Sequence, residues 1–432
     1  MIRDAYSFLQ LWKNQSNRKP LIIQGARQVG KTWLMKEFGQ NEYKQTAYFN
    51  FESTLELHSI FKNGYDIKKI ISALNILAGF QIQSSDTLII FDEIQACPEA
   101  ITSLKYFQEN SPEYSIFAAG SLLGVAIHQG VSFPVGKVDF ITLFPLSFHE
   151  FLNALGKSDL LKVLIQEDFA LIDIFKNQYI ELLKQYYFIG GMPEVVKDFA
   201  FNMNYKKARE IQKNIINAYE NDFSKHAPIN QLPRIRMVWK SIVGQLAKEN
   251  SKFVYNVLRT GARAKDFELA IEWLKDAGLI IIANRISKPG LPLSAYADWT
   301  RFKVYLNDVG LLCAMGDLNP EIVLSGHALF VEFKGAVSEQ FVIQQLVSQN
   351  CKAYYWSPEN GNSEVDFVIQ KDNQVIPIEV KSSENLKSRS LRVYYDKYKP
   401  YITIRTSLSG FKQQDWMQNI PLFGFQAWVI RP

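Results

Sequence analysis

The chain has 432 residues, of which 47% are hydrophobic and 21% are charged, and its formal net charge at pH 7 is +5. This hydrophobic fraction excludes an intrinsically disordered chain and is enough for several domain cores, whereas the small charge excess gives only weak support for nucleic-acid binding. No apolar stretch reaches the ~18 residues of a membrane-spanning helix, and residues 1–15 lack the apolar segment of a signal peptide. The composition therefore predicts a cytoplasmic protein without membrane association.

A glycine-rich loop follows the first predicted strand, Leu21–Ile23, and precedes a predicted helix that starts at Trp33. It matches the pattern G-x-x-x-x-G-K-[ST], in which backbone N–H groups surround the phosphates of a nucleotide. We expect Lys31 to supply a positive charge, and the hydroxyl of Thr32 to bind Mg²⁺. The expected nucleotide-binding residues here are Gly25, Ala26, Arg27, Gln28, Val29, Gly30, Lys31, Thr32 and Trp33. A glycine-rich turn that binds nothing is the alternative, but the flanking strand and helix favour ATP or GTP.

A second apolar strand, residues 87–91, ends in Asp92 and Glu93. In parallel sheets, ligands bind beyond the carboxyl ends of the strands, so this end should lie near the glycine-rich loop. We expect Asp92 to hold Mg²⁺ through water and Glu93 to act as the general base in ATP hydrolysis. An exposed acidic strand end is the alternative.

Two more predicted strands, residues 46–51 and 114–119, complete an α/β fold with a parallel P-loop NTPase sheet. Ser121 follows the second of them and should lie near Glu93. In ATPases with an extra strand between the loop strand and the acidic strand, a polar residue at this position senses the γ-phosphate. A turn serine remains an equally good interpretation.

Beyond residue 155 the pattern becomes helical. Residues 159–188 and 203–226 have apolar residues at helical spacing, which predicts a helical lid. Residues 231–325 contain short helices and a predicted hairpin, which is typical of a winged-helix domain that binds DNA. Three basic residues precede its last helix and could meet phosphates, namely Arg259, Arg263 and Lys265. A protein-binding or spacer module is the alternative.

The C-terminal residues carry a second set of charged side chains. Glu339 lies in an apolar helix, and a predicted hairpin places Asp366 on one strand and Glu379 and Lys381 on the next. The period of two puts Glu379 and Lys381 on the same face, within reach of one metal site. Charged residues also occur on edge strands, where they prevent aggregation. The spacing therefore fits either a metal site or a charged edge strand.

Basic and aromatic residues alternate in the segment 387–399. The basic side chains could bind a nucleic-acid backbone and the aromatic rings could stack on bases. An ordinary amphipathic helix explains the pattern equally well. The residues concerned are Lys387, Arg389, Arg392, Tyr394, Tyr395, Lys397, Tyr398 and Lys399.

These motifs together resemble the prokaryotic AAA+-like ATPases with a nuclease-like C-terminal domain, of the AAA_14/DUF4143 type. The resemblance spans nearly the whole chain. It rests on five segments in the same order: Gly25–Thr32, Phe91–Gln95, Ala119–Ser121, Phe144–Phe151 and Gly190–Glu194. The family usually has Gly-Arg before the fourth segment, where this chain has Gly136-Lys137, so a phosphate contact by Lys137 would lack the bidentate geometry of arginine.

The C-terminal residues are similar to the PD-(D/E)-x-K nuclease superfamily, with Val365 in place of the proline. The resemblance implies that Glu339, Asp366 and Glu379 hold Mg²⁺ and that Lys381 positions or deprotonates water.

The sequence thus predicts four domains: a P-loop ATPase core at 1–155, a helical lid at 156–230, a winged helix at 231–325 and an α/β restriction-endonuclease-like domain at 326–432. Two functions remain open. In one, ATP hydrolysis controls a metal-dependent DNA endonuclease. In the other, the C-terminal domain is catalytically silent and the chain is a nucleotide-dependent switch that binds DNA or a protein.

The expected partners are a nucleotide, DNA, and a second copy of the chain or another protein. AAA+-type sites are often completed by an arginine from a neighbouring subunit. Arg27 could act within its own chain, and Arg234, Arg236 and Arg301 are the other candidates.

Overall fold

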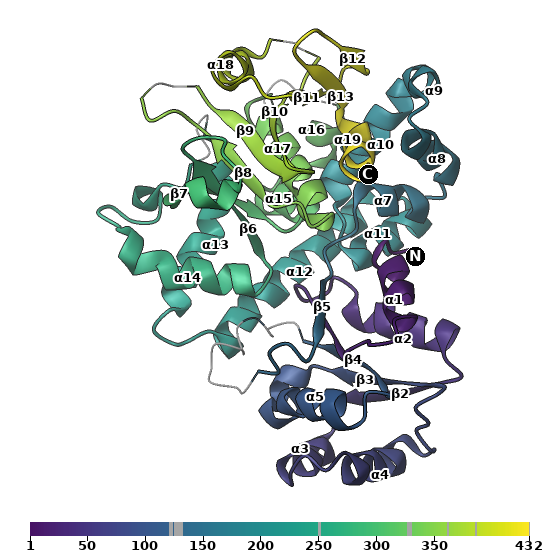
Figure 1. Ribbon diagram of the computed structural model, residues 1–432. Coiled ribbons are helices and arrows are strands. Elements are labelled where there is room, and N and C mark those ends of the chain that lie inside the picture. The colour runs from purple at the N-terminus through teal and green to yellow at the C-terminus, as the bar shows by residue number, and fades with distance from the viewer. Residues whose placement is uncertain are drawn as a thin grey trace. The chain divides into compact units, whose positions relative to one another are not determined.

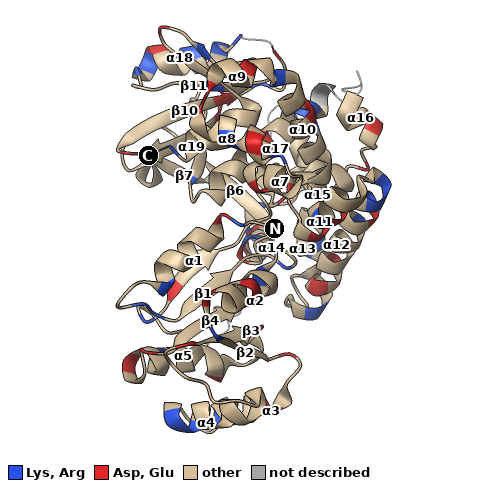
Figure 2. Cartoon of the chain, turned by 90° about the vertical axis from the view of Figure 1, so that its right-hand side faces the viewer, with Lys and Arg blue, Asp and Glu red and all other residues tan. Residues whose placement is uncertain are grey.

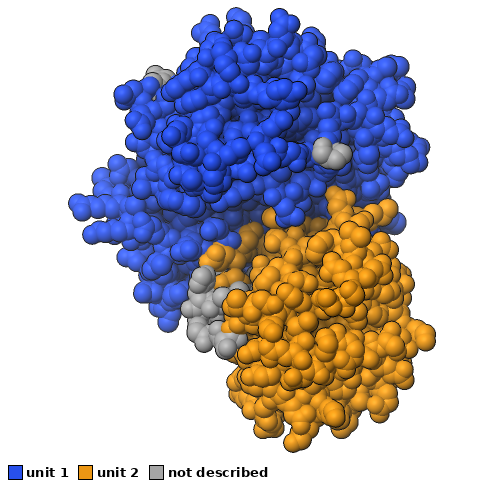
Figure 3. Space-filling view, viewed as in Figure 1, with its two compact units in different colours: residues 1, 145–275, 279–432 blue, residues 2–144, 276–278 orange. Residues whose placement is uncertain are grey.

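The computed structural model describes residues 1–120, 124, 133–248, 252–325, 331–360, 363–384 and 387–431 (Figure 1). The chain divides into two compact units (Figure 3). The smaller unit contains residues 2–144 and 276–278, and the larger contains residues 1, 145–275 and 279–432. No helix in the described part of the chain has both the length and the apolar character required to cross a membrane.

The smaller unit is built on a parallel sheet with strand order β2-β3-β4-β1-β5. Its elements are α1 (Ala5–Lys13), β1 (Leu21–Gln24), α2 (Lys31–Glu42), β2 (Gln45–Asn50), α3 (Leu55–Lys62), α4 (Ile67–Ala78), β3 (Thr87–Asp92), η1 (Ile94–Ala96), α5 (Pro98–Asn110), β4 (Ser115–Ala119) and β5 (Asp139–Thr142). β4 lies between β1, which precedes the glycine-rich loop, and β3, which ends in Asp92. The sheet therefore has the extra strand between these two that the sequence analysis considered. The parallel sheet confirms the α/β fold.

Apolar side chains cover both faces of this sheet. On one face Phe91 packs against Phe61 of α3, with ring centroids 5.6 Å apart. On the other, Phe117 contacts Trp12 of α1 and Phe38 of α2, at 5.0 Å and 5.4 Å. Strands buried on both faces are continuous apolar runs, as β3 and β4 are. This packing fixes the carboxyl ends of β1 and β3, where the glycine-rich loop and Asp92 lie.

The larger unit combines helices with a second sheet. Its helices are α7 (Phe148–Ala154), α8 (Ser158–Gln166), α9 (Phe169–Ile174), α10 (Lys176–Ile189), α11 (Pro193–Asn202), α12 (Tyr205–His226), α13 (Leu232–Leu246), η2 (Tyr255–Val257), α14 (Ala264–Asp276), η3 (Leu293–Tyr296), α15 (Val309–Met315), α16 (Pro320–Ser325), α17 (Val331–Ser348), α18 (Arg389–Tyr398), η5 (Leu422–Gly424) and α19 (Phe425–Val429). Its strands are β6 (Ile280–Ile286), β7 (Ala297–Leu306), β8 (Ala353–Trp356), β9 (Val365–Lys371), β10 (Gln374–Val380), β11 (Ile404–Ser407), β12 (Lys412–Gln413) and β13 (Gln418–Pro421).

The second sheet has the order β12-β13-β11-β10-β9-β8-β6-β7. The predicted hairpin is present as β6 and β7, which pair antiparallel. However, β6 also pairs with β8 in parallel, and Asn284 lies opposite Tyr354. The hairpin assigned to a winged helix and the strands assigned to a nuclease-like domain therefore form one continuous sheet.

Buried glutamines of α17 link distant segments of the larger unit. The amide of Gln340 pairs with both the N–H and the carbonyl of Leu306, at 2.9 Å and 2.7 Å. The amide oxygen of Gln345 accepts from the N–H of Phe148 at 3.0 Å. Each such bond contributes roughly 0.5–1.5 kcal/mol and, more importantly, satisfies a backbone group that is buried. These bonds join α7, β7 and α17 in one unit.

A substitution in the glycine pair at the end of α10 should destabilise the larger unit. A Cβ on Gly191 would lie 2.1 Å from the carbonyl oxygen of Leu146. The Gly191 N–H also donates to Asp308 at 2.6 Å, so the backbone has little room to move away. We expect Gly191→Ala to destabilise the protein by about 3 kcal/mol, measured by urea unfolding.

Gly244 of α13 provides the matched control, since a Cβ there meets nothing within 4 Å. Gly244→Ala should be neutral or stabilise by up to ~1 kcal/mol, because alanine favours helix interiors. Equal stabilities of the two variants would contradict this account of Gly191.

The buried imidazole of His149 should make stability depend on pH. Burial lowers the pKa of His149 from 6.5 to about 4. The folded state thus binds fewer protons than the unfolded state, and the stability contributed by the neutral ring is present above pH 6.5 and is lost as the pH falls toward 4. At ~1.4 kcal/mol per unit, the wild type should lose about 2 kcal/mol more than His149→Gln between pH 6.5 and 5. Urea unfolding at both pH values measures this difference, and parallel curves would contradict it.

Candidate functional site

The glycine-rich loop connects β1 to α2 in a conformation rich in positive φ. Gly25, Gln28 and Gly30 have φ values of 143°, 65° and 93°. A Cβ on Gly25 would lie 2.2 Å from the carbonyl oxygen of Leu143, so only glycine fits there. The ammonium of Lys31 donates to the carbonyls of Gly25 and Ala26, both at 2.8 Å. The loop therefore closes around the lysine side chain.

The first turn of α2 has features that suit a phosphate group. Its N-cap is Gly30, which has no side chain to bond the first N–H groups, and the turn carries no acidic residue. Free N–H groups at a helix N-terminus and a nearby ammonium favour an anion. Burial lowers the pKa of Lys31 to about 8, although Glu93 and Asp92 oppose this shift. Trp33, in the same turn, is 39% exposed.

Asp92 lies at the carboxyl end of β3 and contacts the loop directly. The hydroxyl of Thr32 donates to Oδ2 of Asp92 at 2.7 Å. The hydroxyl of Tyr48 donates to the same oxygen at 2.8 Å. Asp92 is only 2% exposed, so these donors replace much of its hydration. The parallel sheet thus brings together two oxygen ligands that the sequence places sixty residues apart, and their chemistry fits Mg²⁺.

Tyr48 is a site residue that the sequence analysis missed. It lies on β2, next to β3 in the sheet. Burial raises its pKa to about 12, which keeps the hydroxyl protonated as a donor. Tyr48 and Asn50 alternate with buried Ala47 and Phe49, so the period of two along β2 was the available signal.

Glu93 follows Asp92 in a left-handed conformation, with φ of 51°. The side-chain amide of Gln95 donates to Oε2 of Glu93 at 2.6 Å. This contact holds the carboxylate at the carboxyl edge of the sheet, beside the loop. Ser121 lies outside the described residues. Arg27 pairs with Glu52, at 3.6 Å.

Lys137, which the sequence analysis considered for a phosphate contact, contacts a carboxylate. Lys137 lies 2.9 Å from Glu109, and its side chain is 41% exposed. Its charge is therefore partly compensated within its own unit.

A second group of charged residues lies on the sheet of the larger unit. Glu339 comes from α17, Asp366 from β9, and Glu379 from β10, directly before Val380 and Lys381. The N–H of Val380 donates to Oδ2 of Asp366 at 2.7 Å. Lys381 lies 2.7 Å from Glu379. The four residues predicted from the sequence therefore belong to one electrostatically coupled group, named here the carboxylate cluster.

Three more residues complete this cluster and were not predicted. Lys303 of β7 is 1% exposed and pairs with Glu339 at 3.4 Å and with Glu364 at 2.6 Å. The hydroxyl of Tyr305 donates to Oε2 of Glu339 at 2.8 Å. Residues 302–306 were predicted as a strand of a different domain, so their alternation pointed to no site. The carboxylate cluster consists of Glu339, Glu364, Asp366, Glu379, Lys303, Tyr305 and Lys381.

Burial and charge shift the acid–base equilibria of the cluster. Burial, together with Glu339 and Glu379, raises the pKa of Asp366 well above its ordinary value. Burial also raises the pKa of Glu379, although Lys381 opposes this. For Lys303 burial acts to lower the pKa, but Glu339 and the other carboxylates raise it well above its usual value. The lysine therefore remains an ammonium ion at neutral pH.

The predicted metal ligands are held by protein groups. In the described ranges, no three or more His, Cys, Asp or Glu side chains are arranged so that they could hold a metal ion. Glu339 pairs with Lys303, Glu379 pairs with Lys381, and Asp366 accepts a hydrogen bond from Val380. The metal site at Glu339, Asp366 and Glu379 therefore stays a prediction.

The basic and aromatic residues from Arg389 to Tyr398 lie in α18, whose charges are visible in Figure 2, whereas Lys387 precedes this helix and Lys399 follows it. The guanidinium of Arg392 lies over the rings of Tyr395 and Trp416, 5.4 Å and 5.0 Å from their centroids. Asp396 pairs with Arg392 at 3.0 Å and with Lys399 at 3.1 Å. An acidic residue therefore offsets part of the positive charge on this surface.

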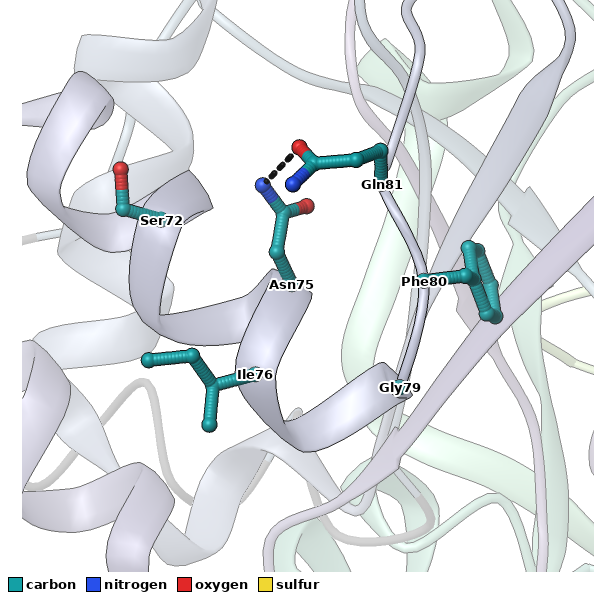
Figure 4. Close-up of a pocket in the computed structure, with 6 residues that line it drawn as sticks. All are labelled: Ser72, Asn75, Ile76, Gly79, Phe80 and Gln81. Carbon is teal, nitrogen blue, oxygen red and sulfur yellow. Dashed lines mark hydrogen bonds between the residues drawn. The ribbon is translucent and has the colours of Figure 1, made fainter.

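A pocket of about 530 Å³ lies at the end of α4 (Figure 4). The amide of Asn75 donates to Gln81 at 2.9 Å inside it. The other residues labelled there are Ser72, Ile76, Gly79 and Phe80. This lining offers neither charge nor a nucleophile of enhanced reactivity, so the chemistry of the smaller unit lies at the glycine-rich loop.

Comparison with known proteins assigns families to three segments. Residues 17–152 match the AAA domain family, residues 180–322 a domain of unknown function (DUF8612), and residues 334–424 another (DUF4143). No curated protein matches the chain.

Solved structures with similar folds include a Walker-type ATPase of Pyrococcus abyssi, PABY2304, which is 14% identical with a TM-score of 0.46; the match covers 73% of this chain and 96% of that one. The ORC1 protein of Aeropyrum pernix, solved in complex with DNA, is 12% identical with a TM-score of 0.29 and coverage of 72% and 90%. AMPPCP-bound DnaA from Aquifex aeolicus is 13% identical with a TM-score of 0.26 and coverage of 62% and 86%.

The parallel sheet, the conformation of the glycine-rich loop and the match of residues 17–152 to the AAA domain family all indicate the same kind of domain. Residues 17–152 are therefore a P-loop ATPase domain of the AAA type.

Proposed function

We propose that the chain binds and hydrolyses ATP with Mg²⁺ and that its nucleotide state controls the binding of DNA by the larger unit. The observation that carries the ATPase proposal is the 2.7 Å hydrogen bond between Thr32 and Asp92. This bond joins the two residues that are expected to hold Mg²⁺, and the adjacent Lys31 supports the proposal with a positive charge.

Each residue of this site has a proposed role. The backbone N–H groups of the loop and Lys31 bind the phosphates. Thr32 and Asp92 would hold Mg²⁺, which would supply positive charge to the phosphates during phosphoryl transfer. Tyr48 orients Asp92 through its hydrogen bond. Glu93, held by Gln95, accepts a proton from the attacking water.

The ATPase proposal is tested by measuring phosphate release from ATP by the purified full chain. Hydrolysis should require Mg²⁺ and stop when EDTA removes it. Equal rates with and without EDTA would contradict the roles of Thr32 and Asp92.

Basic surfaces of the larger unit support DNA as the partner. Arg259 and Arg263 are exposed before α14, and Lys265 is exposed in its first turn. Arg392 of α18 lies beside the half-buried rings of Tyr395 and Trp416, and Lys399, just after α18, lies over Tyr395. Cations at these positions can contact phosphates, and the rings can stack on unpaired bases.

The second candidate function is metal-dependent cleavage of DNA, and the contacts among Asp366, Val380, Glu379 and Lys381 favour it. It predicts that supercoiled DNA is cut with Mg²⁺ or Mn²⁺ by the wild type and not by Asp366→Ala. It also predicts that Lys31→Ala alters cleavage if nucleotide gates the activity.

A further inference from the structure

The ammonium of Lys303 lies inside the carboxylate cluster. Its Nζ is 2.6 Å from Oε1 of Glu364 and 3.4 Å from Oε2 of Glu339. Oε2 of Glu339 also accepts the hydroxyl of Tyr305. At 1% exposure, Lys303 has exchanged its water shell for these carboxylates. The position of the ammonium is therefore set by two partly buried carboxylates, one on α17 and one just before β9.

The charges of the cluster and of one neighbouring arginine nearly balance without a metal ion. The positive charges are Lys303 and Lys381 of the cluster and Arg405 of β11, which is fully buried and interacts electrostatically with Glu379. The opposing acids are Glu339, Glu364, Asp366 and Glu379. With every group ionised, these three bases and four acids leave one negative charge. A divalent cation would reverse the sign to a net positive charge beside the buried side chains of Lys303, Glu379 and Arg405, which costs energy in a medium of low dielectric.

We propose that Lys303 is a built-in counter-ion that occupies the carboxylate cluster in place of a divalent cation. The larger unit then holds no Mg²⁺ or Mn²⁺ at this cluster and does not cleave DNA, so this proposal opposes the second candidate function given above. In this proposal the cluster fixes α17, β7, β9 and β10 relative to one another as part of a binding module. The proposal does not depend on ATP hydrolysis by the smaller unit.

Binding of Mn²⁺ to the nucleotide-free full chain, followed by electron paramagnetic resonance, tests this proposal. Four proteins are compared: the wild type, Asp366→Asn, Lys303→Met and the double variant Lys303→Met/Asp366→Asn. Asparagine at 366 can still accept the hydrogen bond from Val380, and methionine at 303 keeps most of the buried volume of lysine. Any Mn²⁺ bound near Asp92 contributes equally to all four.

The wild type and Asp366→Asn should bind Mn²⁺ alike. Lys303→Met should gain one site, with affinity at least roughly tenfold above any wild-type site at the cluster, because one positive charge a few ångströms away has gone. The double variant should lose that site. These results would establish Lys303 as the ion that excludes the metal.

Two results would overturn the proposal. One is a Mn²⁺ site in the wild type that disappears in Asp366→Asn, and the other is a folded Lys303→Met that gains no site. Circular dichroism and thermal unfolding establish whether Lys303→Met folds. If it does not, the comparison of the wild type with Asp366→Asn still decides, because equal binding supports the proposal and a difference overturns it.

Discussion

Glu93→Gln should leave ATP binding intact and lower the rate of ATP hydrolysis by roughly 10²- to 10⁴-fold, which is the usual contribution of a positioned general base. Glutamine has nearly the same shape as glutamate and can still accept the hydrogen bond from Gln95. It cannot take a proton from water. Phosphate release and the affinity for a fluorescent ATP analogue measure the two effects separately.

Glu113→Gln is the matched control for this prediction. Glu113 is exposed and precedes β4, at the amino edge of the sheet, whereas Glu93 follows β3 at the carboxyl edge. The same chemical change there should leave hydrolysis unaltered. An unchanged rate in Glu93→Gln would remove Glu93 from its proposed role, and a parallel loss of ATP binding would show that its role is structural.

Lys31→Ala should weaken ATP binding by about 100-fold or more, since loss of one partner of a buried charge interaction typically costs 2–5 kcal/mol. The ammonium is 6% exposed and bonds to two carbonyls of the loop. Its removal takes away a phosphate ligand and also the group around which the loop closes. Isothermal titration calorimetry with ATP measures the affinity.

Lys44→Ala is the corresponding control, because Lys44 is 80% exposed and only pairs with Asp86 across 3.3 Å. Exposed pairs of this kind contribute little, so ATP binding and stability should both remain. ATP binding by Lys31→Ala at wild-type affinity would show that the nucleotide lies elsewhere.

The nucleotide-binding part of the fold could be predicted because its signals are local. The loop, the apolar strand before Asp92 and the rule that ligands bind at the carboxyl ends of parallel strands together placed Thr32 and Asp92 near each other. Tyr48 could not be placed in the same way. Its contact with Asp92 depends on β2 and β3 being neighbours in the sheet, which no local pattern specifies.

The organisation of residues 145–432 was harder to predict because buried polar residues link its segments. Gln340, Gln344 and Gln345 of α17 were assigned no role from the sequence, yet all three are buried because their amides pair with backbone and side-chain groups. Polar residues that satisfy buried backbone groups carry no hydrophobic signal. The sequence therefore suggested separate domains where the structure has one sheet and one helix with a polar interior face.

Lys303 is a second residue whose position depends on long-range pairing. In the sequence it is one charged residue in the return strand of the predicted winged-helix domain. The pairing of β6 with β8 brings β7 into the sheet that carries Asp366 and Glu379. Only this long-range pairing brings a lysine of β7 to Glu339 of α17. The metal site was therefore predicted from Glu339, Asp366, Glu379 and Lys381, without Lys303.

The central claim, that nucleotide state controls DNA binding, is tested most directly by the affinity of the chain for fluorescent single-stranded and duplex DNA at fixed salt. Anisotropy would be measured without nucleotide, with ADP and with a non-hydrolysable ATP analogue, for the wild type and Lys31→Ala. The account predicts wild-type affinities that differ by roughly fivefold or more between nucleotide states, a typical size for coupling between sites, and no difference in Lys31→Ala. Wild-type affinities that are equal in all three states, or no DNA binding in any of them, would contradict it.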